Sequence, residues 1–166
     1  MKQALLLKPG ESCGAGPVNI FGGEISTLLA GSNTEGVYAI TWGTTPPNGG
    51  PPLHRHSRED EWFYILEGEL DFEVDGKILH AGKGCSVFAP RGTAHQFMNS
   101  GTTPALMLSV VQPSGLENFF NELAAATAGM KGEPPRSVVL PIFEKYGLEL
   151  LGPPMAVRSA LSKVSA

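Results

Sequence analysis

Glycine and proline divide this chain into short segments, and their spacing constrains the fold more than any other feature. The 166 residues include 21 glycines and 14 prolines. Both residue types interrupt helices and strands and favour turns. A chain that is interrupted this often favours many short strands joined by tight turns, which is typical of an all-β barrel or sandwich.

The segments between these turns have strand character, because β-branched and aromatic residues are concentrated in them. Asp75-Gly76 predicts a two-residue hairpin turn, since glycine adopts positive φ at little cost. The predicted strands are Ile20–Leu29 (one strand or two), Val37–Thr41, Leu53–His56, Glu61–Glu67, Glu69–Val74, Lys77–His80, Cys85–Ala89, His95–Asn99 and Ala105–Val111.

The pattern becomes helical after Pro113. A capping box from Ser114 to Glu117 predicts a helix start, and apolar residues then recur on one helical face as far as Ala124. Residues 138–146 predict a second helix and residues 148–151 a short strand, whereas the tail past Pro154 carries no clear signal. We expect one domain, with a barrel over residues 1–112 and a helical extension over residues 113–166 packed on it.

Composition excludes several classes of partner. The chain is 42% hydrophobic with a net charge of −4, and its twelve basic residues form no cluster, so no nucleic-acid partner is expected. The apolar run within Met1–Lys8 is too short for an export signal and none approaches a membrane span, so no membrane partner is expected. Cys13 and Cys85 cannot build a disulfide framework, which favours a cytoplasmic location.

Three histidines and one glutamate have the spacing of a metal site. Alternate residues of a strand share a face, so His54 and His56 point the same way. Glu61 begins the next strand after a polar corner, and His95 follows the turn at residues 90–92. Three imidazoles and a carboxylate suit one divalent transition metal, namely Fe, Mn, Ni, Co, Cu or Zn. Four ligands on an octahedral ion leave two positions for water, dioxygen or substrate.

The neighbouring residues have alternative interpretations. His80 lies in a polar hairpin and is expected to face solvent. Glu59 and Asp60 could orient a histidine ligand, but a solvated turn is the favoured interpretation. Arg91 could meet an anionic substrate, although a surface arginine in a turn is favoured. Cys85 is expected to be a small buried residue in an apolar strand.

Two segments resemble the two cupin motifs. The first motif is carried by His54, His56, Glu61 and Gly68. The second is carried at every position by Gly84, Pro90, Gly92, His95 and Asn99. The first departs only at its leading glycine, because position 48 is Asn48 and Gly49 follows it. The resemblance covers about residues 37–111 and implies a double-stranded β-helix, or jelly-roll barrel, in which His54, His56, Glu61 and His95 are the metal ligands.

Further segments look like single-domain quercetin-dioxygenase-type cupins. They are Pro51-Pro-x-His-x-His, Glu59-Asp-Glu-Trp-Phe-Tyr-x-Leu-Glu-Gly68, Phe119-Phe120 and Tyr146-Gly-Leu-Glu-Leu-Leu-Gly-Pro-Pro154. This resemblance implies a metal-dependent dioxygenase acting on a small aromatic or enolic molecule, with Glu61 as both ligand and general base. The alternatives are a Lewis-acid isomerase, cyclase or decarboxylase, and a non-catalytic small-molecule-binding cupin. Phe63, Ile65 and Phe97 would either wall the pocket or pack the core. We expect a homodimer, since an open barrel has edge strands to protect.

Overall fold

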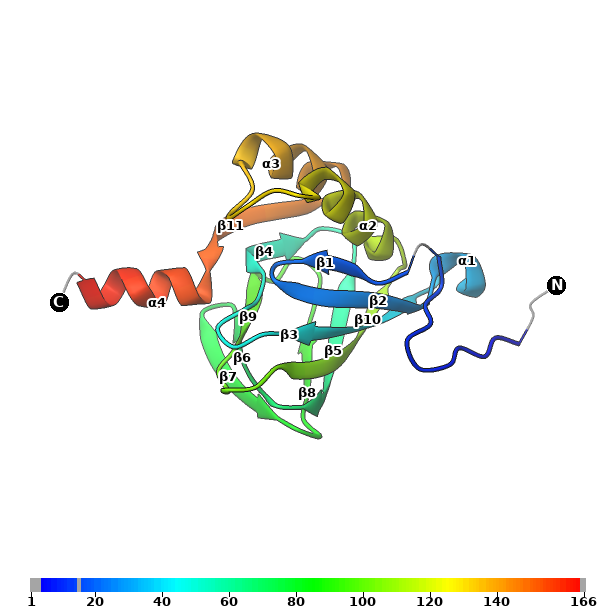
Figure 1. The fold of residues 1–166 in the computed structure, drawn as a ribbon, viewed down its shortest axis with the longest axis horizontal. Helices are drawn as coiled ribbons and strands as arrows, with labels where there is room; N and C mark the ends of the chain where they lie inside the picture. Colours follow the sequence, from blue (N-terminus) through cyan, green and yellow to red (C-terminus); the bar gives the residue numbers. More distant parts are fainter. Residues whose placement is uncertain (1–3, 15, 165–166) are drawn as a thin grey trace.

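Two antiparallel sheets face each other and form the body of the molecule (Figure 1). The computed structural model describes residues 4–14 and 16–164. The larger sheet has the order β1 (Val18–Ile20), β2 (Gly23–Leu29), β3 (Ala39–Thr45), β10 (Ala105–Gln112), β5 (Asp60–Glu67) and β8 (Ser86–Ala89). The smaller has the order β11 (Leu148–Pro154), β4 (Pro52–His56), β9 (His95–Asn99), β6 (Glu69–Val74) and β7 (Lys77–Gly82). The expected all-β jelly-roll fold is confirmed.

The tight turns lie where glycine was expected to place them. The β6–β7 hairpin turns at Asp75 and Gly76, whose φ angles are 46° and 76°. Gly68, between β5 and β6, has a φ of 81°, and a Cβ there would lie 2.8 Å from the backbone of Ala105. A larger residue at position 68 would therefore push β10 away from this corner.

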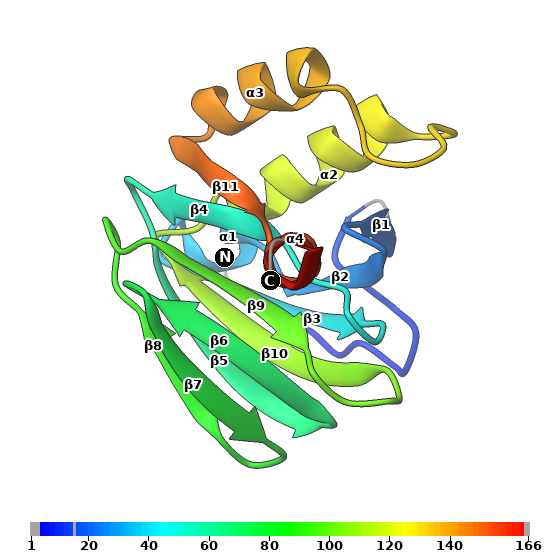
Figure 2. The ribbon, with the colours of Figure 1, turned by 90° about the vertical axis from the view of Figure 1, so that its left-hand side faces the viewer.

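Helices cover one end of the sandwich. The helices α2 (Leu116–Thr127) and α3 (Arg136–Lys145) lie above β4 and β11 (Figure 2). β11 then pairs with β4, which confirms the strand predicted at residues 148–151 and extends it to Pro154. Two helices were not predicted, the short α1 (Gly31–Thr34) and α4 (Met155–Val164), which projects from the body (Figure 1).

The start of α2 differs from the predicted capping box. The N-cap residue is Gly115, and no side chain caps it. The buried carboxylate of Glu117 instead accepts hydrogen bonds from the backbone amides of Gly115, at 2.7 Å, and Gly31, at 2.8 Å. Glu117 therefore joins α2 to α1, an arrangement that brings together positions 86 residues apart.

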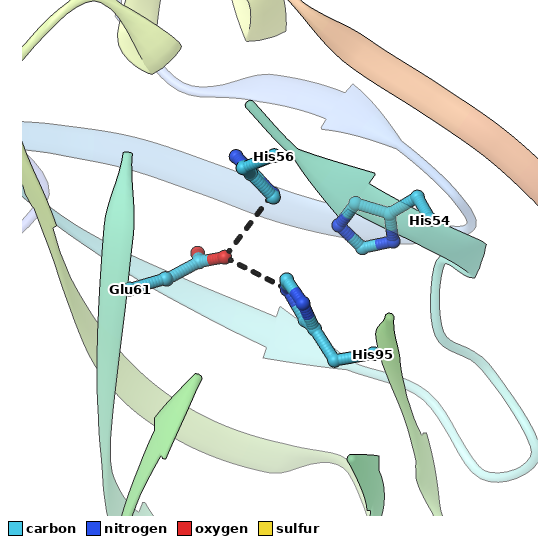
Figure 3. A group of neighbouring side chains, drawn as sticks. All are labelled: His54, His56, Glu61 and His95. Carbon is cyan, nitrogen blue, oxygen red and sulfur yellow. Dashed lines mark hydrogen bonds and ion pairs between the residues drawn. The ribbon is translucent and has the colours of Figure 1, made fainter. Parts of the chain in front are cut away.

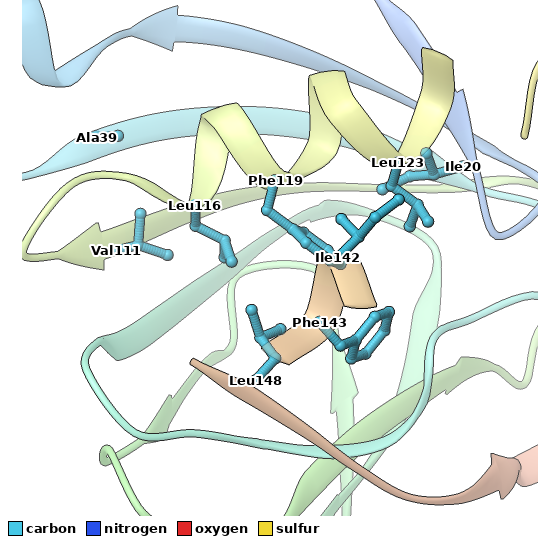
Figure 4. Close-up of a cluster of buried hydrophobic side chains, with 9 residues drawn as sticks. All are labelled: Ile20, Ala39, Val111, Leu116, Phe119, Leu123, Ile142, Phe143 and Leu148. Atoms are coloured by element: carbon cyan, nitrogen blue, oxygen red, sulfur yellow. The ribbon is translucent and has the colours of Figure 1, made fainter. Parts of the chain in front are cut away.

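Apolar side chains form two clusters between these layers. One fills the far half of the sandwich around Phe63, Ile65 and Phe72. The other joins the helices to the barrel and contains Ile20, Ala39, Val111, Leu116, Phe119, Leu123, Ile142, Phe143 and Leu148 (Figure 4). Within it the rings of Phe119 and Phe143 pack edge to face with centroids 5.0 Å apart. The second cluster fixes α2 and α3 over one end of the barrel.

Cys85 is exposed and precedes β8, because the strand begins at Ser86, so the expectation of a buried cysteine was wrong. Among the described residues, no helix is long and apolar enough to cross a membrane. The segment Met1–Lys8, which contains the short apolar run, lies partly outside the described residues.

Candidate metal centre

Three strands bring the predicted ligands to one place inside the sandwich. His54 and His56 alternate along β4 and both are buried, whereas Arg55 between them points outward to Glu149 on β11, at 3.0 Å. His95 on β9 lies directly opposite His54 in the register of the two strands. The facing sheet contributes a carboxylate from β5, so the group spans both layers of the fold.

The turn before β9 positions its histidine. Gly92 has a φ of 79°, a conformation that favours glycine, and its amide donates to the carbonyl of His56 at 2.7 Å. This bond ties the end of β4 to the turn that leads into β9. The second motif therefore sets the position of His95 relative to the histidines of the first.

His54, His56, Glu61 and His95, here called the His/Glu cluster, converge closely (Figure 3). Each offers one ligand atom, and these atoms all lie within 4.8 Å of one another. Oε2 of Glu61 lies 3.3 Å from Nε2 of His95 and 3.5 Å from Nε2 of His56. All four side chains are at most 8% exposed. The cluster could hold a single metal ion.

Backbone carbonyls orient two of the rings. Nδ1 of His54 lies 2.8 Å from the oxygen of Pro52, and Nδ1 of His95 lies 3.0 Å from the oxygen of Thr93. A carbonyl only accepts, so each Nδ1 carries a proton and donates it. In a neutral ring this leaves the Nε2 lone pair free, and Nε2 is the nitrogen turned to the cluster.

His56 is oriented by a carboxylate. Its Nδ1 lies 3.4 Å from Oε2 of Glu59, which is itself only 5% exposed. The favoured expectation of a solvated turn was therefore wrong for Glu59, and the alternative that it orients a histidine is supported. Nε2 of His56 is buried without a hydrogen-bond partner. A buried nitrogen without a partner beside a carboxylate fits a site for a cation.

The electrostatics distinguish two of the histidines. Burial lowers the pKa of His54 well below its usual 6.5, and the nearby His95 and His56 lower it further, so its ring is neutral at neutral pH. For His95, burial also lowers the pKa, but the hydrogen bond and charge of Glu61 outweigh it and the net pKa is raised. A cation and the His95 proton would compete for the same place beside Glu61.

The remaining polar candidates lie outside the cluster. Arg91 forms a bidentate pair with Asp60, with Nη2 2.8 Å from one oxygen and Nε 3.1 Å from the other. Hydrogen bonds from Arg91 lower the pKa of Asp60 to about 2. His80 is exposed and bonds to Asp71 at 2.7 Å, which confirms that it faces solvent.

A cavity adjoins the His/Glu cluster and extends toward the helices. The space open to the centres of water molecules is about 80 Å³, enough for several waters. Its lining includes His54, His56 and Glu61 of the cluster, Thr41, Phe63, Phe97 and Ser109 from the strands, and Leu116, Phe119, Phe120 and Phe143 from the helices. Of the three predicted wall residues, Phe63 and Phe97 line this cavity and Ile65 packs in the core.

The sequence alone did not predict that the helices line this cavity. The helical periodicity of residues 116–124 identified an apolar face but not the surface that it covers. Thr41 and Ser109 were also missed, since isolated hydroxyl residues in strands give no signal. The one clue in the sequence was that each lies two residues from an inward-facing residue of the same strand, and alternate residues of a strand share a face.

Part of the chain matches a known domain family. Residues 41–111 match the family model for the cupin domain. This segment runs from β3 to β10 and contains the whole His/Glu cluster. The expected resemblance to cupins is therefore confirmed for this segment.

The individual relatives are similar to this chain at 28–36% sequence identity. The chain is 29% identical to quercetin 2,3-dioxygenase of Bacillus subtilis over 121 residues, which are 66% of this chain and 35% of that protein. It is 36% identical to an oxalate-binding protein of Thermotoga maritima over 66 residues, 40% of this chain and 54% of that protein. A solved structure of a predicted oxalate decarboxylase from T. maritima is 28% identical with a TM-score of 0.56, and the match covers 64% of this chain and 99% of that one.

The chain thus spans about a third to a half of the length of these two curated relatives. Their names differ in chemistry, since one acts on an aromatic molecule and the other binds a small dicarboxylate. The comparisons therefore show a cupin-like segment that contains a possible metal site and has a relative named as a dioxygenase. The lining of the cavity is the further observation that bears on the class of substrate.

Proposed function

We propose that this protein is a metal-dependent dioxygenase that acts on an uncharged aromatic or enolic small molecule. The observation that carries the proposal is the cavity, which joins the His/Glu cluster to a wall of aromatic side chains. Four protein ligands on one divalent ion would leave positions for a substrate oxygen, as oxygenase chemistry requires. The relative named quercetin 2,3-dioxygenase supports the same class of reaction.

The proposed ligands are Nε2 of His54, His56 and His95 and a carboxylate oxygen of Glu61. A divalent metal held there would supply Lewis acidity at the enol oxygen of the substrate. The carbonyl bonds to His54 and His95 hold their rings in the required tautomer. Burial of all four ligands lowers the effective dielectric constant around them, which strengthens their electrostatic interactions.

Glu61 would also act on the substrate proton. Its carboxylate lies among the three imidazoles and on the cavity wall, so one oxygen can remain with the ligands while the other meets a substrate hydroxyl. A general base must come within hydrogen-bond reach of the proton that it takes. In this role Glu61 accepts the hydroxyl proton as the substrate becomes an enolate.

The cavity lining favours an aromatic substrate over a dicarboxylate. Among the described residues that line it, none is lysine or arginine, and Glu61 is the one acidic side chain. A dicarboxylate such as oxalate would have the metal as its one cationic partner, and its second carboxylate would enter a mostly apolar space without a lysine or arginine to pair with, which is costly. Phe119, Phe120 and Phe143 instead offer flat apolar surfaces for an aromatic ring.

Oxygen uptake tests the proposal. Protein reconstituted separately with Fe, Mn, Ni, Co or Cu would be given flavonols and 1,3-diketones in an oxygen-electrode cell. We expect uptake with at least one metal and substrate, loss of it in Glu61→Gln, and retention in the matched control His80→Ala. Oxygen-independent turnover would assign the site to Lewis-acid chemistry instead. Absence of uptake with every metallated form would refute the dioxygenase proposal.

A further inference from the structure

Two hydroxyl side chains face each other on the inner wall of the cavity. Thr41 on β3 and Ser109 on β10 are directly paired in the register of the two strands. Their oxygens lie 2.9 Å apart and form a hydrogen bond. Both residues line the cavity, and Thr41 is 4% exposed.

One of the two hydroxyl protons of Thr41 and Ser109 is not used in the hydrogen bond between them. Each hydroxyl carries a single donor, and their mutual hydrogen bond uses only one of the two protons. Within the described part of the chain, neither side-chain oxygen has another hydrogen bond. Whichever hydroxyl accepts in the pair therefore presents a free O–H, and the cavity is the space beside it.

The strand register fixes where this donor lies relative to the His/Glu cluster. Ser109 pairs with Phe63 on β5, and Val111 pairs with Glu61. Ser109 is thus the diagonal neighbour of Glu61 on the same face, a separation of roughly 7–8 Å between backbones. That length is close to the span of a small fused-ring molecule whose other end reaches Glu61.

The surroundings make the donor selective. Phe63, Phe97, Met107 and Ile25 line the same cavity and offer no hydrogen bonds from their side chains. Thr44 and Thr45 also line the cavity, and the Thr44 hydroxyl oxygen accepts a hydrogen bond from the amide of Glu24. A free donor in a mostly apolar wall discriminates between substrates, because a substrate without a matching oxygen leaves it unpaired. A neutral hydroxyl donor also suits a phenol or carbonyl oxygen without calling for a charge on the substrate.

We infer that the Thr41–Ser109 pair determines substrate specificity by donating a hydrogen bond to a second, neutral oxygen of an aromatic substrate whose first oxygen lies at the His/Glu cluster. This inference rests on the proposed function and narrows its substrate class to polyoxygenated aromatic molecules. It assigns the pair a positioning role and no part in bond making or breaking.

Binding of two flavonols without oxygen tests the inference. Quercetin carries further hydroxyl groups on its rings, whereas 3-hydroxyflavone has only the enol end. Each would be titrated anaerobically into the metal-loaded protein, and Kd would be taken from the quenching of tryptophan fluorescence. The decisive variant is Thr41→Val/Ser109→Ala, because either single change leaves one hydroxyl that can still donate.

We expect the double variant to bind quercetin roughly three- to tenfold more weakly and 3-hydroxyflavone with unchanged affinity. The conservative variant Thr41→Ser/Ser109→Thr should retain the wild-type preference. Equal weakening for both flavonols would show a packing role and overturn the inference, as would no weakening for either. Failure of both flavonols to bind the wild-type protein would also overturn it.

The outcome is separable from that of the proposed function. Kd is measured without oxygen, so the selective loss is expected even if the protein turns out to consume none. Conversely, oxygen uptake with an unaltered flavonol preference in the double variant would uphold the dioxygenase and refute the role of the pair.

Discussion

Oε2 of Glu59 lies 3.4 Å from Nδ1 of His56, and both side chains are buried. The contact orients the one ring of the cluster that has no backbone carbonyl as its acceptor. His54 and His95 are held by carbonyls, which no substitution of a side chain removes. Glu59 is therefore the position at which ligand orientation can be altered without touching a ligand.

Loss of Glu59 should weaken metal binding. Glu59→Ala removes the acceptor for Nδ1 of His56, and such changes behind a histidine ligand typically cost 10- to 100-fold in metal affinity. Glu59→Gln keeps an acceptor oxygen and should lose less. Competition with a chromogenic chelator measures the affinities, with exposed Glu67→Ala as the control. Wild-type affinity in Glu59→Ala would show that the contact does not orient His56.

Metal content should depend on the buried histidines and not on the exposed one. Protein produced without a histidine tag should contain close to one equivalent of a divalent transition metal by elemental analysis. His54→Ala and His95→Ala each remove a ligand and should bring the content near zero, whereas His80→Ala should match the wild type. A wild-type protein that stays metal-free after reconstitution would contradict the proposed metal site.

Local patterns predicted the barrel well, for identifiable physical reasons. Strand alternation put His54 and His56 on one face, and the turn at residues 90–92 placed the start of β9 at His95. These features depend on neighbours in the chain, so the residues alone specify them. The predicted ligand set converges because the same glycine and proline turns fix where each strand starts.

Features set by long-range packing could not be predicted. Glu59 was expected to lie in a solvated turn, but it is buried. Burial of a turn residue depends on tertiary packing, which the local sequence does not specify. Glu117 matched a capping box, but its partner Gly31 lies on another helix. The helix α4 gave no clear signal, and one of its contacts, between Arg158 and Glu73, joins residues 85 positions apart.

Packing of α3 against α2 should contribute strongly to stability. Phe143 is 1% exposed and packs on Phe119 in the cluster that joins the helices to the barrel. Phe143→Ala should lower the free energy of unfolding by about 3–5 kcal/mol, because the cavity left behind cannot fully collapse. Phe88, which is 55% exposed, supplies the control, since Phe88→Ala should change it by less than about 1 kcal/mol. Urea titrations followed by circular dichroism measure both, and similar losses would contradict the assigned core.

The contact of α4 with the smaller sheet should make stability depend on pH in the acid range. Burial raises the pKa of Glu73, but hydrogen bonds from Arg158 and Gln96, the latter at 2.6 Å, outweigh it and hold the pKa below 4.5. A carboxyl whose pKa is lower in the folded state stabilises the protein above the unfolded pKa, near 4.5. That stabilisation is lost as the pH falls through the lower, folded value.

Arg158→Ala should therefore destabilise the protein at neutral pH and flatten this acid dependence. The expected cost is about 1–2 kcal/mol at pH 7, modest because the Arg158 side chain is 38% exposed and solvent screens the pair. The loss should shrink as the pH falls below 4.5, where the wild type loses the same interaction. Thermal melts across this range measure the effect, with the exposed Arg136→Ala as control. A loss that stays constant with pH would show that Arg158 stabilises α4 by packing and not through its charge on Glu73.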